Sequence, residues 1–90
     1  MAKRSAQSAL PPTTDALRRT LADNIRGLRK RQSISQEDLA FRCGLDRTYV
    51  SAVERCIWNV SLGNIEKMAL ALGVEPWQLL LPEQRKLEEK

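Results

Sequence analysis

The fold is decided by the stretch SQEDLAFRCGLDRTYVSAVER, which spans residues 35–55. Ser35 is followed three residues later by Asp38, an arrangement close to a capping box, and this predicts a helix over about residues 36–43. Gly44 stands directly after that segment, where a residue with a left-handed backbone commonly ends a helix. The first half of the stretch therefore predicts a short helix with a defined beginning and end.

The second half of the stretch predicts another short helix. Asp46 is a second N-cap, and the helix that follows runs from Arg47 to about Arg55, with Val50 and Val53 on its inner face. Only residues 44–46 separate the two predicted helices. So short a connection is typical of a helix-turn-helix rather than of a long antiparallel hairpin.

Outside this stretch, apolar residues recur in steps of three and four. Leu17, Leu21, Ile25 and Leu28 mark one face of a helix that runs to about residue 32. Ser61 caps a helix over residues 62–72, and a short fifth helix begins near Pro76 and passes through Leu80. The sequence therefore predicts an all-α fold with five helices and no strand.

The chain divides into three parts. Residues 1–12 are small, polar and basic and end in two prolines, which predicts a flexible basic arm. Residues 13–82 contain all five predicted helices and form one domain, as the total of 90 residues also suggests. Residues 83–90 are expected to be a charged tail.

The composition argues against several classes of function. The chain has no histidine, no Gly-x-Ser-x-Gly sequence and no Gly-rich phosphate loop, so an enzyme is not expected. Two cysteines cannot supply four zinc ligands, and no metal, cofactor or small-molecule ligand is expected. No apolar run approaches the roughly 18 residues of a membrane span, so a cytoplasmic protein is expected. The net charge of +4 mildly favours an anionic partner.

Several motifs together resemble the phage repressor and Cro type of helix-turn-helix domain, the XRE-like family. They are the segment 35–40, the sequence Arg47-Thr48-Tyr49, and the turn Asn59-Val60-Ser61-Leu62. Within that family the chain is most similar to the controller proteins of restriction–modification systems. The resemblance implies a repressor-like fold and a regulator of transcription that binds double-stranded DNA at a palindromic operator as a homodimer. The alternatives are an antitoxin or phage-type repressor, or a helical protein-interaction module without DNA binding.

The resemblance also implies roles for individual residues around the second helix of the motif, the recognition helix. Contacts to base edges in the major groove are expected from Arg47, Thr48, Tyr49 and Ser51. Contacts to phosphate are expected from Gln36, Arg55 and Asn59. Arg29 and Glu54 are expected to pair and so to hold the recognition helix in place.

The C-terminal apolar residues predict a dimer interface. The fifth helix has more large apolar side chains than one face of a short helix can bury in its own core. The interface is therefore expected to include Trp77, Leu79, Leu80, Leu81, Val60 and Leu62. The alternative is that Leu79 and Leu80 close the core of the monomer.

One position departs from the family pattern. The family usually has glycine after the Glu-Arg pair that ends the recognition helix, and here Cys56 stands in that place. Glycine adopts a positive φ freely, whereas cysteine in that conformation is mildly strained. Either the loop takes another path, or a cost of about 1 kcal/mol is tolerated.

Overall fold

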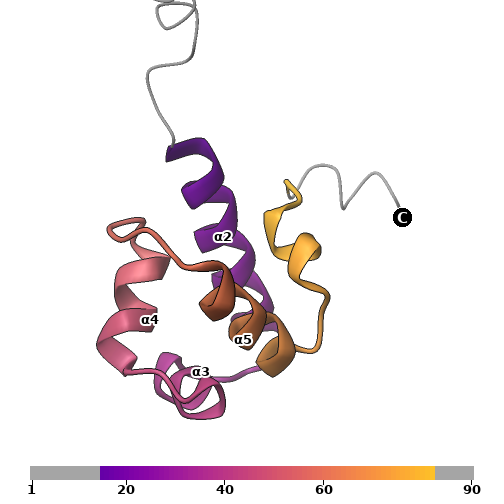
Figure 1. Ribbon diagram of the computed structural model, residues 1–90. Helices are drawn as coiled ribbons and strands as arrows, with labels where there is room; N and C mark the ends of the chain where they lie inside the picture. The colour runs from indigo at the N-terminus through magenta and orange to yellow at the C-terminus, as the bar shows by residue number, and fades with distance from the viewer. Residues whose placement is uncertain (1–14, 83–90) are drawn as a thin grey trace, which may run out of the picture.

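The computed structural model describes residues 15–82, and within that range the chain is all-helical, with no strand (Figure 1). The four α-helices of this range are α2 (Asp15–Arg31), α3 (Gln36–Cys43), α4 (Arg47–Glu54) and α5 (Leu62–Leu72). A 3-10 helix, η1 (Pro76–Leu80), takes the place of the predicted fifth helix. The arm predicted for residues 1–12 and the tail predicted for residues 83–90 lie outside the described residues.

The predicted N-caps each fix the start of a helix. Ser35 Oγ accepts the backbone N–H of Asp38 at 2.9 Å, and the Asp38 carboxylate accepts the backbone N–H of Ser35, which completes the capping box. Asp46 and Ser61 each accept a backbone N–H from the first turn of their helix at 3.1 Å. These bonds satisfy donors that the first turn of a helix leaves without an internal partner. The starts of α3, α4 and α5 are therefore set by local sequence.

The four α-helices within residues 15–82 end in the same backbone motif. A residue with a positive φ stands one or two positions after the last helical residue, and this φ is 58° at Ser33, 72° at Gly44, 61° at Cys56 and 76° at Gly73. In each case the next backbone N–H donates to the carbonyl five residues earlier, at 2.9 to 3.0 Å. This is the Schellman arrangement, which glycine adopts without strain. Of the two alternatives for Cys56, the structure shows the strained one, because the loop keeps the path that glycine would take.

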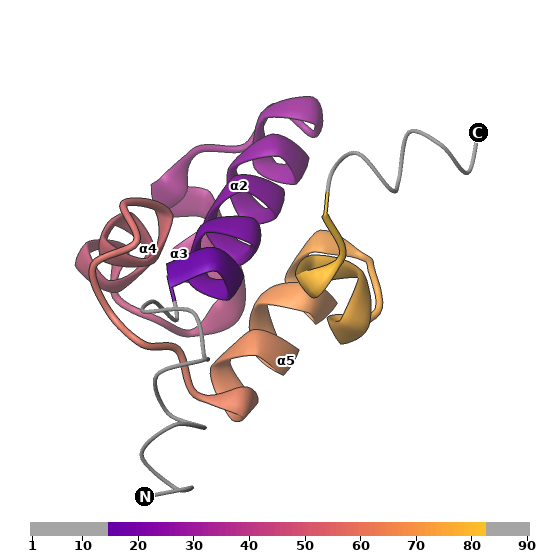
Figure 2. The ribbon, with the colours of Figure 1, turned by 90° about the horizontal axis from the view of Figure 1, so that it is seen from above.

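Helix α2 runs through the middle of the molecule, with α4 on one side of it and η1 on the other (Figures 1 and 2). The core between the helices is aliphatic, and its fully buried members include Ile25, Leu39, Val50, Met68 and Leu79. Leu79 is 0% exposed, so a partner subunit cannot reach it. The prediction that Leu79 contributes to a dimer interface is therefore wrong, because its side chain is needed to close the core of its own chain.

A buried asparagine, which the sequence did not indicate, ties the C-terminal segment to α2. Asn24 Nδ2 donates to the backbone carbonyls of Leu79 at 2.7 Å and Leu81 at 2.8 Å. A buried amide requires such partners, since leaving it without them is unfavourable. The two bonds fix how η1 and the residue after it lie against α2, and so decide which C-terminal apolar side chains remain outside the core.

Candidate nucleic-acid interface

The N-terminal end of α4 presents polar side chains to solvent. Arg47 and Thr48 are exposed, and Tyr49 and Ser51 are half-buried. Val50 and Val53 are buried and fix which face of the helix points toward the core. The structure thus brings the four predicted base contacts together near one end of α4. An exposed arginine there can donate two hydrogen bonds to the O6 and N7 atoms of a guanine.

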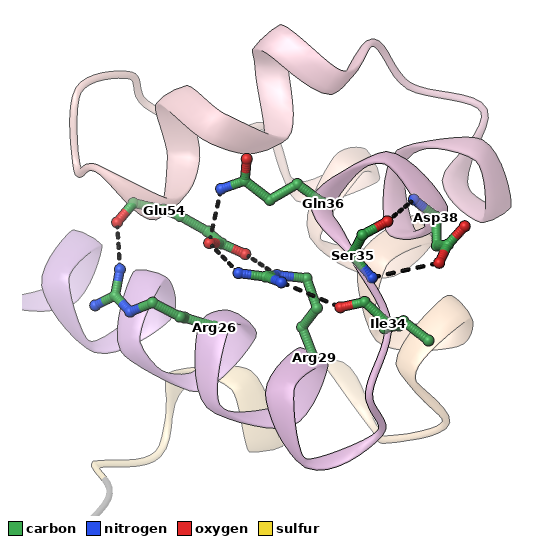
Figure 3. A network of polar contacts seen from close by, with 7 residues as sticks. All are labelled: Arg26, Arg29, Ile34, Ser35, Gln36, Asp38 and Glu54. Atoms are coloured by element: carbon green, nitrogen blue, oxygen red, sulfur yellow. Dashed lines mark hydrogen bonds and ion pairs between the residues drawn. The ribbon is translucent and has the colours of Figure 1, made fainter.

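A buried ion pair holds the other end of α4 (Figure 3). Glu54 is 4% exposed, and its carboxylate accepts hydrogen bonds from Arg29 Nε at 2.8 Å and Arg29 Nη2 at 3.0 Å. Gln36 Nε2 donates to the same carboxylate at 3.0 Å, and Arg26 Nη1 donates to the backbone carbonyl of Glu54 at 2.8 Å. Side chains of both α2 and α3 therefore hold the C-terminal end of α4.

Arg29 is the centre of this network. Its hydrogen bond to Glu54 raises the pKa of the Arg29 guanidinium above its ordinary value, although burial alone would lower it. Arg29 Nη1 also donates to the backbone carbonyl of Ile34 at 3.1 Å, in the turn between α2 and α3. The structure thus brings Arg29 and Glu54 together in two parallel hydrogen bonds, a geometry that is stronger and more directional than a single contact.

The predicted phosphate contacts lie in two places. Gln36 lies in the first turn of α3, where its side chain is half-buried against Glu54. Its amide group has two N–H donors, so the bond to Glu54 does not use its whole donor capacity. Arg55 and Asn59 are exposed in the loop that follows α4. Contact of these three residues with phosphate stays a prediction.

The same loop contains an aromatic residue that the sequence analysis did not single out. Trp58 lies between Arg55 and Asn59 and is 45% exposed. Its ring centroid is 5.7 Å from that of Tyr49, and the two ring planes are inclined by 46°. Rings at this separation attract each other. The signal available in the sequence was only a tryptophan placed between two predicted phosphate contacts.

A second surface, where α5, η1 and the start of α2 meet, is apolar and includes the half-buried Val60 and Leu80 and the 79% exposed Leu62. Leu70 of α5 and Trp77 of η1 are also exposed, at 84% and 60%, and Leu81, directly after η1, is half-buried. Leu17 does not face the core as its spacing predicts; it is exposed and lines an open groove of about 310 Å³ with Val60, Leu62 and Leu80. Leu70 is an exposed apolar residue that the sequence analysis left out.

Three observations concern other kinds of site. No helix within residues 15–82 is long and apolar enough to cross a membrane. Within the same residues, no group of three or more His, Cys, Asp or Glu side chains is arranged to hold a metal ion. Cys43 is buried, which raises the pKa of its thiol, whereas Cys56 is half-buried.

With α3, the turn at residues 44–46 and α4, the structure has the geometry of a helix-turn-helix. The family model described as Helix-turn-helix matches residues 25–76. A hypothetical transcription factor of Neisseria meningitidis serogroup B is 57% identical over 86 residues, which are 96% of this chain and 80% of that protein. A crystal structure of a hypothetical transcription factor from Neisseria, also 57% identical, covers 91% of this chain and 94% of that one, with a TM-score of 0.81. The chain belongs to the helix-turn-helix family.

Restriction–modification controller proteins are among its relatives. C.AhdI from Aeromonas hydrophila is 50% identical, and its structure covers 71% of this chain and 97% of that chain with a TM-score of 0.68. C.Esp1396I was solved as a tetramer in complex with its natural 35 base-pair operator. It is 29% identical and covers 81% of this chain and 92% of that one, with a TM-score of 0.67. The predicted resemblance to the controller proteins is confirmed.

Proposed function

We propose that this chain is a sequence-specific, double-stranded DNA-binding regulator of transcription that binds a palindromic operator as a homodimer. The observation that carries the proposal is α4, whose N-terminal end exposes Arg47 and Thr48 while its C-terminal end is fixed by the buried carboxylate of Glu54. Its relatives are named as a hypothetical transcription factor and as controller proteins, and one of the controller proteins was solved on its operator. No enzymatic activity is proposed.

In this proposal α4 lies in the major groove of the duplex. Contacts to base edges come from Arg47, Thr48, Tyr49 and Ser51. Contacts to phosphate, which set register and orientation without specifying sequence, come from Gln36, Arg55 and Asn59. The net charge of +4 adds an attraction to the duplex that weakens as salt concentration rises.

The proposed homodimer forms through the apolar surface. Its residues are Trp77, Leu80, Leu81, Val60 and Leu62, to which we add the exposed Leu70. A single recognition helix reads only a few base pairs, and a two-fold pair presents two such helices about one turn of DNA apart. Because η1 and α4 lie on opposite sides of α2, pairing near η1 leaves the N-terminal end of α4 accessible (Figure 2).

Selection of bound sites from a pool of random duplexes tests the proposed function. The expected result is enrichment of two inverted half-sites about one helical turn apart, with affinity that falls steeply as salt rises. Arg31→Ala, which removes one exposed positive charge at the end of α2, is the control for the effect of charge alone. A chain that enriches no sequence, or whose binding is insensitive to salt, would fit a protein-interaction module and overturn the proposal.

Native mass spectrometry at micromolar concentration tests the dimer. The wild-type protein is expected to be a dimer and Leu81→Glu a monomer, because the substitution places a charge in the apolar surface. Phe41→Glu is a matched control, since Phe41 is 87% exposed on α3, outside that surface. A wild-type protein that stays monomeric, both free and on a palindromic duplex, would contradict the proposed dimer.

A further inference from the structure

Trp58 is not among the predicted DNA contacts, and it contacts α4 from the loop that carries Arg55 and Asn59. Its ring lies 5.7 Å from that of Tyr49, the third residue of α4, and the planes are inclined by 46°. Tyr49 is partly buried and also packs against the hydrophobic core. The Tyr49 ring is therefore in contact with both the fixed interior of the domain and the indole of the loop.

The backbone places Trp58 where this contact forms. After α4, the N–H of Cys56 donates to the carbonyl of Val53 and the N–H of Ile57 donates to the carbonyl of Ala52, both at 3.0 Å. Because these bonds fix the path of the chain immediately before Trp58, the indole is held against Tyr49 by a defined turn. Arg55 and Asn59, on either side of the turn, are exposed.

We propose that Trp58 is a positioning residue for base recognition, which fixes the ring of Tyr49 and so couples the loop carrying Arg55 and Asn59 to the base-reading end of α4. This inference rests on the proposed function. A tyrosine near the start of a helix has more than one staggered side-chain conformation, and contact with a second ring favours one of them. A side chain already held in its binding conformation loses less freedom when the complex forms.

The test compares three variants at residue 58 and residue 49 with a matched control. Trp58→Leu removes the ring but keeps apolar bulk, Trp58→Phe keeps a ring, and Tyr49→Leu removes the other partner. Phe41→Leu is the control, because Phe41 is another aromatic residue, is 87% exposed on α3, and belongs to neither the proposed DNA contacts nor the proposed dimer interface. Each variant is passed through the same selection from random duplexes, and its thermal unfolding is measured to show that it is folded.

The expected result is a loss of affinity of about two- to tenfold for Trp58→Leu on the preferred duplex, the size of effect that an aromatic pair supports. Trp58→Leu should also weaken the preference for one base at a position of the half-site, and Tyr49→Leu should weaken the preference at the same position. Trp58→Phe should restore that preference, and Phe41→Leu should not alter it. Trp58→Leu introduced into the Tyr49→Leu variant should have no further effect on preference.

Three results would overturn the inference while leaving the proposed function intact. The first is that Trp58→Leu keeps the affinity and the base preference of the wild-type protein. The second is that Trp58→Leu loses the same affinity on all duplexes. The third is that the changes in base preference caused by Trp58→Leu and Tyr49→Leu simply add in the double variant. A wild-type protein that selects no duplex would overturn the proposed function, and this inference with it. The two kinds of failure are therefore distinguished by the wild-type selection alone.

Discussion

The two ends of α4 are held in different ways. At the N-terminal end the helix is fixed by the Asp46 cap, and Arg47 and Thr48 are exposed. At the C-terminal end Glu54 is buried and accepts hydrogen bonds from Arg29 and from α3. Surface polar groups contribute little to stability, whereas a buried charge is expensive to leave without its partner. The comparison teaches that the residues proposed to contact bases can vary without unfolding the domain, while those that hold the helix cannot.

The largest effect is expected at the buried end. Glu54→Ala should lower the free energy of unfolding by about 3–5 kcal/mol, because it leaves the Arg29 guanidinium without a carboxylate in a site that is largely closed to water. Urea unfolding followed by circular dichroism measures the loss. The control is Asp23→Ala, which breaks the exposed ion pair of Asp23 with Arg26 at 2.7 Å and should cost about 0–1 kcal/mol. Equal losses in the two variants would mean that the buried pair of Glu54 stabilises the domain no more than an exposed ion pair does, and the C-terminal end of α4 would then not be specially held.

A double-mutant cycle sharpens this result. Adding Arg29→Ala to Glu54→Ala should restore part of the stability, since it removes the unpaired charge rather than a further favourable contact. Duplex affinity should fall in Glu54→Ala together with stability and recover with it. Losses from the two substitutions that simply add would show that Arg29 and Glu54 are not coupled.

The next effect is expected at the exposed end, and on binding instead of stability. Arg47→Ala should weaken binding to the preferred duplex by about 1–3 kcal/mol and relax preference at one base pair. Its unfolding free energy should stay within about 0.5 kcal/mol of the wild-type value, since the side chain is exposed. Fluorescence anisotropy with a labelled duplex, beside the same urea titration, measures both quantities. A variant that keeps its affinity and base preference would remove Arg47 from the proposed base contacts.

The sequence predicted those features that depend on neighbouring residues. The caps at Ser35, Asp46 and Ser61 and the helix-ending Gly44 act within one turn of their own position, so the bounds of α3, α4 and α5 could be read from local patterns. The same patterns placed the four predicted base contacts near one end of α4.

The features that the sequence did not show depend on distant parts of the chain. Asn24 bonds to carbonyls 55 and 57 residues away, and these bonds decide that Leu79 faces inward while Trp77 stays exposed. In a helix as short as η1, apolar spacing alone does not say which side meets the core. The contact of Trp58 with Tyr49 likewise depends on the path of the loop, which follows from the backbone of Cys56.

A smaller effect is expected from the cap at the exposed end. Asp46→Ala should lower the unfolding free energy by about 1 kcal/mol, because the backbone N–H of Thr48 loses its acceptor. Glu66→Ala, an exposed substitution in the middle of α5, is the control and should change stability by less than about 0.5 kcal/mol. Thermal unfolding by calorimetry can compare them. A loss for Asp46→Ala as large as that of Glu54→Ala would mean that both ends of α4 are held with equal strength.

The smallest effect is expected at Cys56, and it should be a gain. The left-handed conformation costs a non-glycine residue about 1–2 kcal/mol, and Cys56→Gly removes that strain. Glycine also gives the unfolded chain more freedom, which offsets about 0.4–1 kcal/mol of the gain. The difference leaves a net stabilisation of about 0.5–1 kcal/mol, measurable as a higher urea midpoint with an unchanged slope. Ser33→Gly, at the equivalent position after α2, should stabilise by a similar amount, since its φ of 58° is nearly the same. If Ser33→Gly stabilises and Cys56→Gly does not, the Cys56 side chain makes a favourable contribution that offsets its backbone strain, and the C-terminal end of α4 is held by more than the Glu54 network.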